Sequence, residues 1–169
     1  MEQVVGNDTF RLQEAAQRMS ARPRLLAIAS GGGHWVQLRR LVPAFDGFDV
    51  AYVSTFDHYA TQVADHRYYV VPNASRFELK GFLPGALRAF RILRKERPDA
   101  IITTGSAPML IFLLLGRLMG ARTLWVDSLA NPERMSSSGK IARRIAHGTV
   151  SQWPEVATAE GVRYWGTVL

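Results

Sequence analysis

Three glycines and a histidine follow a short apolar run near the start of the chain, in Ser30–Gly31–Gly32–Gly33–His34. Glycines let the backbone approach an anion closely and adopt positive φ at little steric cost. The amide groups that open the next helix direct the positive end of its dipole toward that anion. We therefore predict a turn that binds phosphate or diphosphate. It is not the dinucleotide fingerprint, because Val36 occupies the position of the third glycine.

His34 is the histidine that adjoins this turn. Near a phosphate, its imidazole can donate a hydrogen bond to an oxyanion or accept a proton from a hydroxyl group. A purely structural role is the alternative. His58 and His66 are too scattered among other ligand-type residues to indicate a metal site, so we expect neither a metal nor a cofactor.

A second loop follows the apolar run at 100–103. Gly105 permits a tight turn, Ser106 can cap a helix, and Pro108 suits the first turn of that helix. We interpret Gly105 and Ser106 as ligand contacts. The alternative is that they only form the start of the following helix.

A third loop, residues 127–140, is rich in hydroxyl groups and longer than a plain turn requires, which is typical of functional loops. Asp127 either orients a substrate hydroxyl or caps the following turn. Ser138, Gly139 and Lys140 are predicted to contact a bound diphosphate.

This third loop is not a nucleotide-binding P-loop. Arg134 stands where the first glycine of that motif belongs, and Ile141 replaces the residue whose hydroxyl would bind magnesium. Hydrolysis of ATP or GTP is therefore not expected. Lys140, Arg143 and Arg144 either attract a diphosphate or solvate the exposed side of a helix.

The elements that must position these loops alternate between strands and helices. We predict strands at 25–29, 50–54, 68–71, 100–103, 123–126 and 149–152, helices at 35–45, 59–65, 82–96, 108–119 and 138–146, and a tail element at 162–165. This alternation favours an α/β fold, a Rossmann-like parallel sheet with helices on both faces. Ligands bind such sheets beyond the carboxyl ends of the strands, where the three loops lie.

Composition limits the class of protein. The chain has 169 residues, 47% of them hydrophobic and 21% charged, which is typical of one globular domain. It has no cysteine, which excludes disulfides and thiolate chemistry. Its formal net charge of +7 favours an anionic partner. Nucleic acid is not expected, because the basic residues form no recognition motif.

We predict two parts, a basic amphipathic leader at 1–23, with a helix over 9–21, and a single domain at 24–169. The leader helix lies on an anionic membrane, is a frayed leader, or packs against the sheet. The helix at 82–96 carries a core-facing apolar stripe, and its basic residues would also suit an anionic membrane surface. The apolar run at 109–115 is too short to span a bilayer.

Five segments together resemble the acceptor-side, membrane-associating subunit of the two-part UDP-N-acetylglucosamine transferase of asparagine-linked glycosylation. They are even more similar to its bacterial counterparts in exopolysaccharide assembly. These segments are residues 30–34, 104–108, 126–130, 136–140 and 164–169. The first is also similar to the glycine loop of the peptidoglycan lipid-linked N-acetylglucosaminyltransferase. Their order and spacing make the resemblance specific.

The resemblance implies the N-terminal half of a GT-B glycosyltransferase. In that family this half holds a lipid-diphosphate-linked sugar acceptor, and a separate small subunit binds the nucleotide sugar. The resemblance also implies that the chain is peripheral, on the cytoplasmic face of a membrane, and nearly inactive alone. It makes His34 a candidate base or phosphate contact and Gly31, Gly32 and Gly33 the acceptor diphosphate loop. N-acetylglucosamine and glucuronic acid are both possible donor sugars.

Two other functions remain open from the sequence. A nonenzymatic scaffold would recruit a transferase to the membrane without contributing to the site. A self-sufficient nucleotide- or phosphate-binding protein would bind its ligand without a lipid or a partner.

Overall fold

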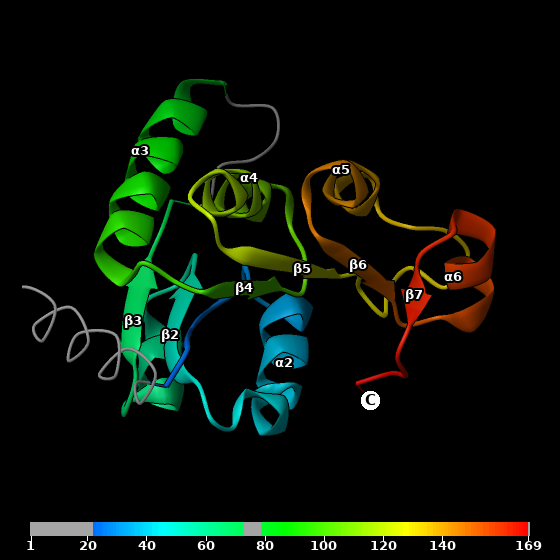
Figure 1. Cartoon of the computed structure of the whole chain (residues 1–169), viewed down its shortest axis with the longest axis horizontal. Helices are drawn as coiled ribbons and strands as arrows, with labels where there is room; N and C mark the ends of the chain where they lie inside the picture. Colours follow the sequence, from blue (N-terminus) through cyan, green and yellow to red (C-terminus); the bar gives the residue numbers. More distant parts are fainter. Residues whose placement is uncertain (1–21, 73–78, 169) are drawn as a thin grey trace, which may run out of the picture.

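The computed structural model describes residues 22–72 and 79–168, with side chains in the second range described from residue 83 (Figure 1). The predicted leader helix lies outside these residues. The strands are β1 (Arg24–Ile28), β2 (Asp49–Ser54), β3 (Arg67–Val70), β4 (Ala100–Thr103), β5 (Arg122–Val126), β6 (Gly148–Ser151) and β7 (Arg163–Tyr164). They form one parallel sheet in the order β3-β2-β1-β4-β5-β6-β7, which confirms the predicted fold class.

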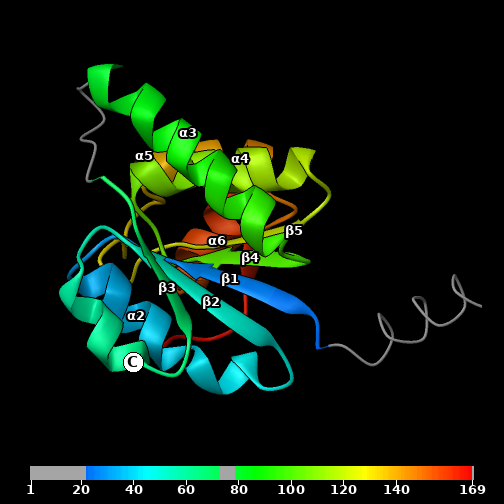
Figure 2. The ribbon, with the colours of Figure 1, turned by 90° about the vertical axis from the view of Figure 1, so that its left-hand side faces the viewer.

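The helices lie on both faces of this sheet. They are α2 (Gly33–Arg40), α3 (Leu79–Glu96), α4 (Leu110–Leu118), α5 (Ser137–Ile145) and α6 (Pro154–Glu160), with short 3₁₀ helices η1 (Val42–Phe45), η2 (His58–Val63) and η3 (Ala107–Met109). Figures 1 and 2 show α3, α4 and α5 over one face and α2 over the other. The sheet is therefore buried on both sides, as parallel sheets usually are.

The interior strand β1 explains why the first loop is so firmly placed. It pairs with β2 on one side and with β4 on the other, so both of its edges are hydrogen-bonded. Leu26 and Ile28 pack into the core under α3 and α4, and Leu25 and Ala27 into the core over α2. This two-sided burial accounts for the continuous apolar run in the sequence.

Several predicted elements differ in detail. The predicted helix at 35–45 divides into α2 and η1, with Pro43 in the first turn of the second piece, and the helix at 108–119 divides into η3 and α4. The helix at 59–65 is the 3₁₀ helix η2. The tail element is β7, and α6 was not predicted.

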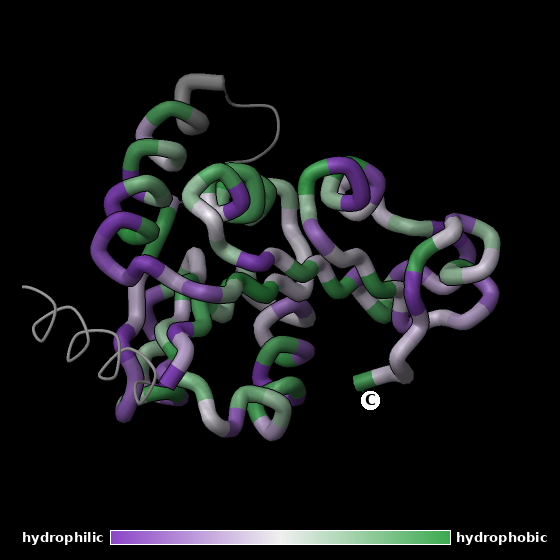
Figure 3. The backbone as a smooth tube through the Cα atoms, viewed as in Figure 1, coloured by the Kyte–Doolittle hydropathy of each residue, from purple (hydrophilic) through white to green (hydrophobic). Residues whose placement is uncertain are grey.

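The outer surface of α3 and α4 is partly apolar. Figure 3 shows apolar and polar residues alternating along α3 and mostly apolar residues in α4. Within the described ranges, each helix is too short or too polar to cross a membrane. The exposed large apolar side chains of this surface are Leu83, Leu87 and Phe90 on α3 and Leu114 and Leu118 on α4.

Candidate functional site

The loops that follow β1, β4 and β5 meet at the carboxyl edge of the sheet. A cavity of about 650 Å³ opens there. It is lined by His34 from the first loop, Gly105 and Ser106 from the second, and residues between Asp127 and Lys140 from the third. The structure therefore brings together six of the predicted site residues, namely His34, Gly105, Ser106, Asp127, Ser138 and Lys140.

The glycine turn itself is partly covered by the loop after β2. A side chain at Gly31 would collide with the ring of Phe56, and the amide of Gly32 donates to the hydroxyl of Tyr59 at 2.9 Å. Gly33 is exposed and begins α2. The lining of the cavity does not include this turn.

Ser30 takes part in this turn through its backbone, because its carbonyl accepts the hydroxyl of Ser54 at 2.9 Å. That bond ties the end of β1 to the end of β2. An anion at the turn would therefore meet the exposed Gly33 at the start of α2 more readily than the amide of Gly32, which is already bonded.

His34 is held by the loop after β4. Its Nδ1 lies 2.9 Å from the carbonyl of Thr104, and the Thr104 hydroxyl donates to the His34 carbonyl at 2.6 Å. Because a carbonyl only accepts, Nδ1 carries a hydrogen, and a neutral ring then has its lone pair on Nε2. The ring lies against Gly105, where a Cβ would come within 2.5 Å of Cε1. Gly105, with φ of 131°, therefore provides both the turn and the space for the imidazole.

Asp127 directly follows β5 and is buried. One oxygen accepts from Trp125 Nε1 at 3.0 Å and from the Ser136 hydroxyl at 2.6 Å. The other accepts from the Ser136 amide at 3.0 Å and from Asn131 Nδ2 at 3.4 Å. Both oxygens are thus bonded to protein donors, so the carboxylate folds the third loop back onto the end of β5. Of its two predicted roles, this geometry favours the local structural one.

The third loop leads into α5 through a tight contact at Gly139. Ser136 is the N-cap of α5 and accepts the amide of Gly139 at 2.9 Å. A Cβ at Gly139 would lie 2.6 Å from an Asp127 oxygen, so this glycine serves packing and does not line the cavity. Ser138, in the first turn of α5, does line it.

The basic residues of the cavity differ in their partners. Lys140 Nζ lies 3.3 Å from Glu160 of α6, so its charge is already paired. Arg134 lines the same cavity and forms no ion pair with the described residues. Arg134 was not among the predicted site residues, although it lies in the predicted loop. It is the cation of this cavity that is most available to an anion.

Two buried glutamines that the sequence analysis missed hold the third loop in place. Gln37 of α2 accepts the amide of Leu129 at 3.2 Å and the Nε2 group of Gln152 at 2.7 Å. Gln152 also donates to the carbonyl of Asp127 at 2.7 Å. The signal available in the sequence was Gln37 beside the apolar Trp35 and Leu38 of the same helix.

The described part of the chain has no group of three histidine or carboxylate side chains placed to hold a metal ion. The polar groups that line the cavity include hydroxyls, one amide, the imidazole of His34 and the cations Arg134 and Lys140. The carboxylate of Asp127 also lines it, but both of its oxygens already accept hydrogen bonds from the protein. Such a set suits an anionic ligand that carries hydroxyl groups.

Fold and site together define a Rossmann-like α/β domain with an anion-suited cavity at its carboxyl edge. Its fold matches the N-terminal domain of the GT-B glycosyltransferase MurG. The MurG structure from Acinetobacter baumannii superposes with a TM-score of 0.66, covers 79% of this chain and 43% of that chain, and is 16% identical. UDP-N-acetylglucosamine 2-epimerase from Rickettsia bellii gives a TM-score of 0.64, with coverages of 84% and 43% and 16% identity.

In sequence, the chain is similar to the UDP-N-acetylglucosamine transferase subunit ALG14 of Cryptococcus neoformans. The two are 29% identical over 101 residues, which are 54% of this chain and 44% of that protein. A second strain's ALG14 is 28% identical over 102 residues. These matches confirm the resemblance inferred from the motifs, and the chain covers less than half the length of these relatives. No protein-family model matches the chain.

Proposed function

We propose that the chain is the acceptor-binding half of a UDP-sugar-dependent glycosyltransferase. It would hold a lipid-diphosphate-linked sugar while a separate small subunit binds the nucleotide sugar. The similarity to a transferase subunit and the MurG-like fold support a transferase role. The observation that carries the proposal is the placement of His34 in a cavity that also holds Arg134 and Lys140.

The geometry of His34 fits a general base. In the transfer, an acceptor hydroxyl oxygen forms a bond to the anomeric carbon while the bond from that carbon to the diphosphate oxygen breaks. The UDP leaves with the electron pair, and the hydroxyl proton passes to Nε2 of His34. The Thr104 carbonyl fixes the ring by its bond to Nδ1–H and stabilises the imidazolium that forms. Arg134, which forms no ion pair with the described residues, would balance the diphosphate charge of the acceptor, and Lys140, already paired with Glu160, would contribute less.

The test uses membrane fractions from cells that express the full chain. Transfer from labelled UDP-N-acetylglucosamine and UDP-glucuronic acid to the lipid fraction is measured for the wild type and His34→Gln. General-base catalysis predicts a loss of roughly 100-fold or more. His66→Gln, an exposed histidine just before β3 at the amino ends of the strands, is the matched control and should keep wild-type transfer.

Each competing function predicts a different result in this assay. A scaffold keeps full transfer in His34→Gln, which would refute the catalytic role. Purified chain that transfers sugar without a second polypeptide would refute the two-subunit arrangement. Purified chain that binds a free nucleotide tightly in calorimetry, without lipid or partner, would favour the self-sufficient binding protein.

Peripheral membrane association is the second part of the proposal. Leu87 and Phe90 of α3 and Leu114 and Leu118 of α4 are exposed. Exposed basic residues accompany them on the same two helices, at Arg88, Arg91, Arg94, Lys95 and Arg117. An apolar surface bordered by cations suits an anionic bilayer surface.

Leu118→Glu tests this surface. Leu118 is 76% exposed, so the change should leave folding intact and weaken sedimentation with anionic vesicles. Val36→Glu, at a 49% exposed site on α2, is the matched control for added charge. Equal vesicle binding by wild type and Leu118→Glu would show that α4 is not the contact.

A further inference from the structure

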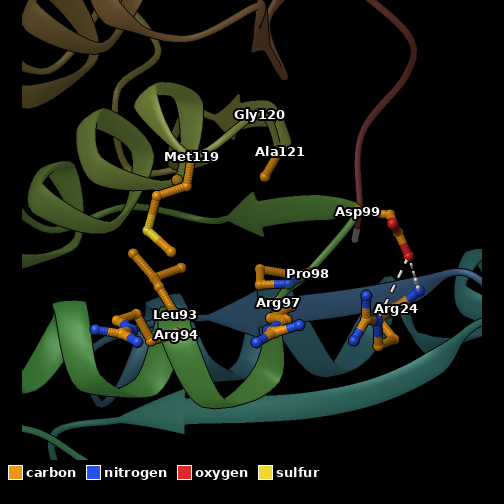
Figure 4. Close-up of a pocket in the computed structure, with 10 residues that line it drawn as sticks. Arg24, Leu93, Arg94, Arg97, Pro98, Asp99, Met119, Gly120 and Ala121 are labelled. Atoms are coloured by element: carbon orange, nitrogen blue, oxygen red, sulfur yellow. Dashed lines mark hydrogen bonds and ion pairs between the residues drawn. The ribbon is translucent and has the colours of Figure 1, made fainter.

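A groove lies at the opposite edge of the sheet from the cavity, between the C-terminal ends of α3 and α4. Its volume is about 460 Å³. Figure 4 shows Arg94 and Arg97, from the end of α3, and Arg24, from the start of β1, in a row that faces the end of α4. Met119 at the end of α4 extends toward Leu93 and forms an apolar part of the lining.

The charges in this groove do not balance. The Asp99 carboxylate is paired with Arg24. It accepts a hydrogen bond from the Arg24 backbone amide at 2.7 Å and lies 3.8 Å from the Arg24 Nε. Glu96 is buried and forms its ion pair with a residue of β3 instead. Among the described residues, Arg94 and Arg97 have no carboxylate within ion-pair distance.

The helix dipoles explain only part of this cation cluster. The C-terminal ends of two helices together carry roughly one negative charge, about half from each helix. The two unpaired guanidinium groups carry two positive charges, so the groove keeps an excess that an outside anion can neutralise. Arginine is suited to this, because its planar fork of donors matches phosphate oxygens.

The backbone of Arg97 gives an independent indication of a role beyond packing. Arg97 caps α3 in the left-handed region, with φ of 45°, and its amide donates to the Leu93 carbonyl at 2.8 Å. Glycine or asparagine usually occupies this cap position, because a side chain is strained there. An arginine at this position costs stability, and its side chain lines the charged groove.

We propose that this groove binds the phosphate of an anionic phospholipid headgroup through Arg94 and Arg97. The apolar rim favours a lipid over free phosphate, since Met119 is 44% exposed and Leu118, beside it in the chain, is 76% exposed. If the acyl chains of a lipid contacted Leu118 and Met119, its phosphate would lie next to the guanidinium groups of Arg94 and Arg97. The site rests on the membrane association proposed above and is independent of sugar transfer.

The test is sedimentation of the full chain with phosphatidylcholine vesicles that contain a low fraction of phosphatidylglycerol. Arg94→Gln and Arg97→Gln should each weaken binding about five-fold, the effect expected for one cation at an anionic surface. Arg163→Gln removes the same charge from β7, the outermost strand on the far side of the sheet from α3. This control should weaken binding less than two-fold. Arg97→Gly should weaken binding as Arg97→Gln does. It should also raise the Tm by roughly 2–4 °C, because glycine adopts the left-handed conformation of this helix cap without strain.

Several outcomes would overturn the site. An equal loss from Arg163→Gln would mean that only total charge matters. Binding of inorganic phosphate at millimolar concentration in calorimetry, or its displacement of the protein from vesicles, would assign the groove to free phosphate. Wild-type protein that binds no vesicles would refute the membrane association as well. Sugar transfer to a detergent-dispersed acceptor is unaffected in every case, so it tests the catalytic proposal separately.

Discussion

Replacing Asp127 by asparagine tests how the third loop is held at the site. The carboxylate accepts four hydrogen bonds, from Trp125 Nε1, the Ser136 hydroxyl, the Ser136 amide and Asn131 Nδ2. An asparagine keeps one acceptor oxygen and turns an NH₂ group toward the donors of the other side. In one orientation the Ser136 amide loses its acceptor, and in the other the buried Trp125 Nε1 does.

The expected loss follows from that count. A buried donor left unpaired costs about 1–3 kcal/mol, and hydrogen bonds to a charged acceptor are worth more than neutral ones. We expect Asp127→Asn to lower the free energy of unfolding by about 2–4 kcal/mol and the urea midpoint by roughly 1–2 M. Tryptophan fluorescence during urea unfolding measures this, with the exposed Asp65→Asn as control.

A loss below about 0.5 kcal/mol would contradict the structural role of the carboxylate, because surface substitutions have effects of that size. If such a stable Asp127→Asn protein still lost sugar transfer, Asp127 would act on the substrate, as in the other predicted role. Stability and transfer measured on the same variant therefore separate the two roles.

Three further predictions follow from specific contacts. Gly139→Ala places a methyl group 2.6 Å from the Asp127 carboxylate and should destabilise the fold by about 1–3 kcal/mol in urea unfolding. Gly105→Ala should displace the His34 ring and reduce transfer at least ten-fold, with folding checked by circular dichroism. Arg67 bonds to Asp49 at 2.9 and 3.0 Å and lowers the pKa of the Asp49 carboxyl from its usual value, so the ionised carboxylate stabilises the fold at pH values above the usual aspartate pKa. That contribution is lost as the pH falls through the folded pKa, so the Tm of Asp49→Asn should fall less than the wild-type Tm below about pH 4.

The sheet could be predicted from the sequence because each strand carries its own signal. The strand at 100–103 occurs at the predicted residues, since it is a short apolar run buried between neighbours. The helix α6 has no comparable signal, because Val156 and Ala157 are its buried residues and two positions do not define a period. Local patterns therefore reveal elements that bury a regular face and miss those that do not.

The site was less predictable because its contacts join distant loops. Gln37 and Gln152 lie 115 positions apart, and nothing in the sequence indicates that they bind one another. The Tyr59 hydroxyl accepts a hydrogen bond from the Gly32 amide, and nothing in the glycine motif itself predicts this contact. The motif located the loop, but the partner of each polar atom depended on the packing of the loops around it.

The two proposed anion sites have a simple spatial relation through α4. The helix begins beside η3 and Ser106, which lines the cavity, and is followed by Met119, which lines the groove. Its nine residues span about 14 Å at 1.5 Å per residue. Exposed Leu114 and Leu118 lie along that length, so a membrane on this side would run parallel to the helix. Cavity and groove would then both lie near the headgroup layer, which is where the diphosphate of a lipid-linked acceptor is held. One membrane contact would therefore serve both sites, with the groove fixing the depth at which the cavity meets its ligand.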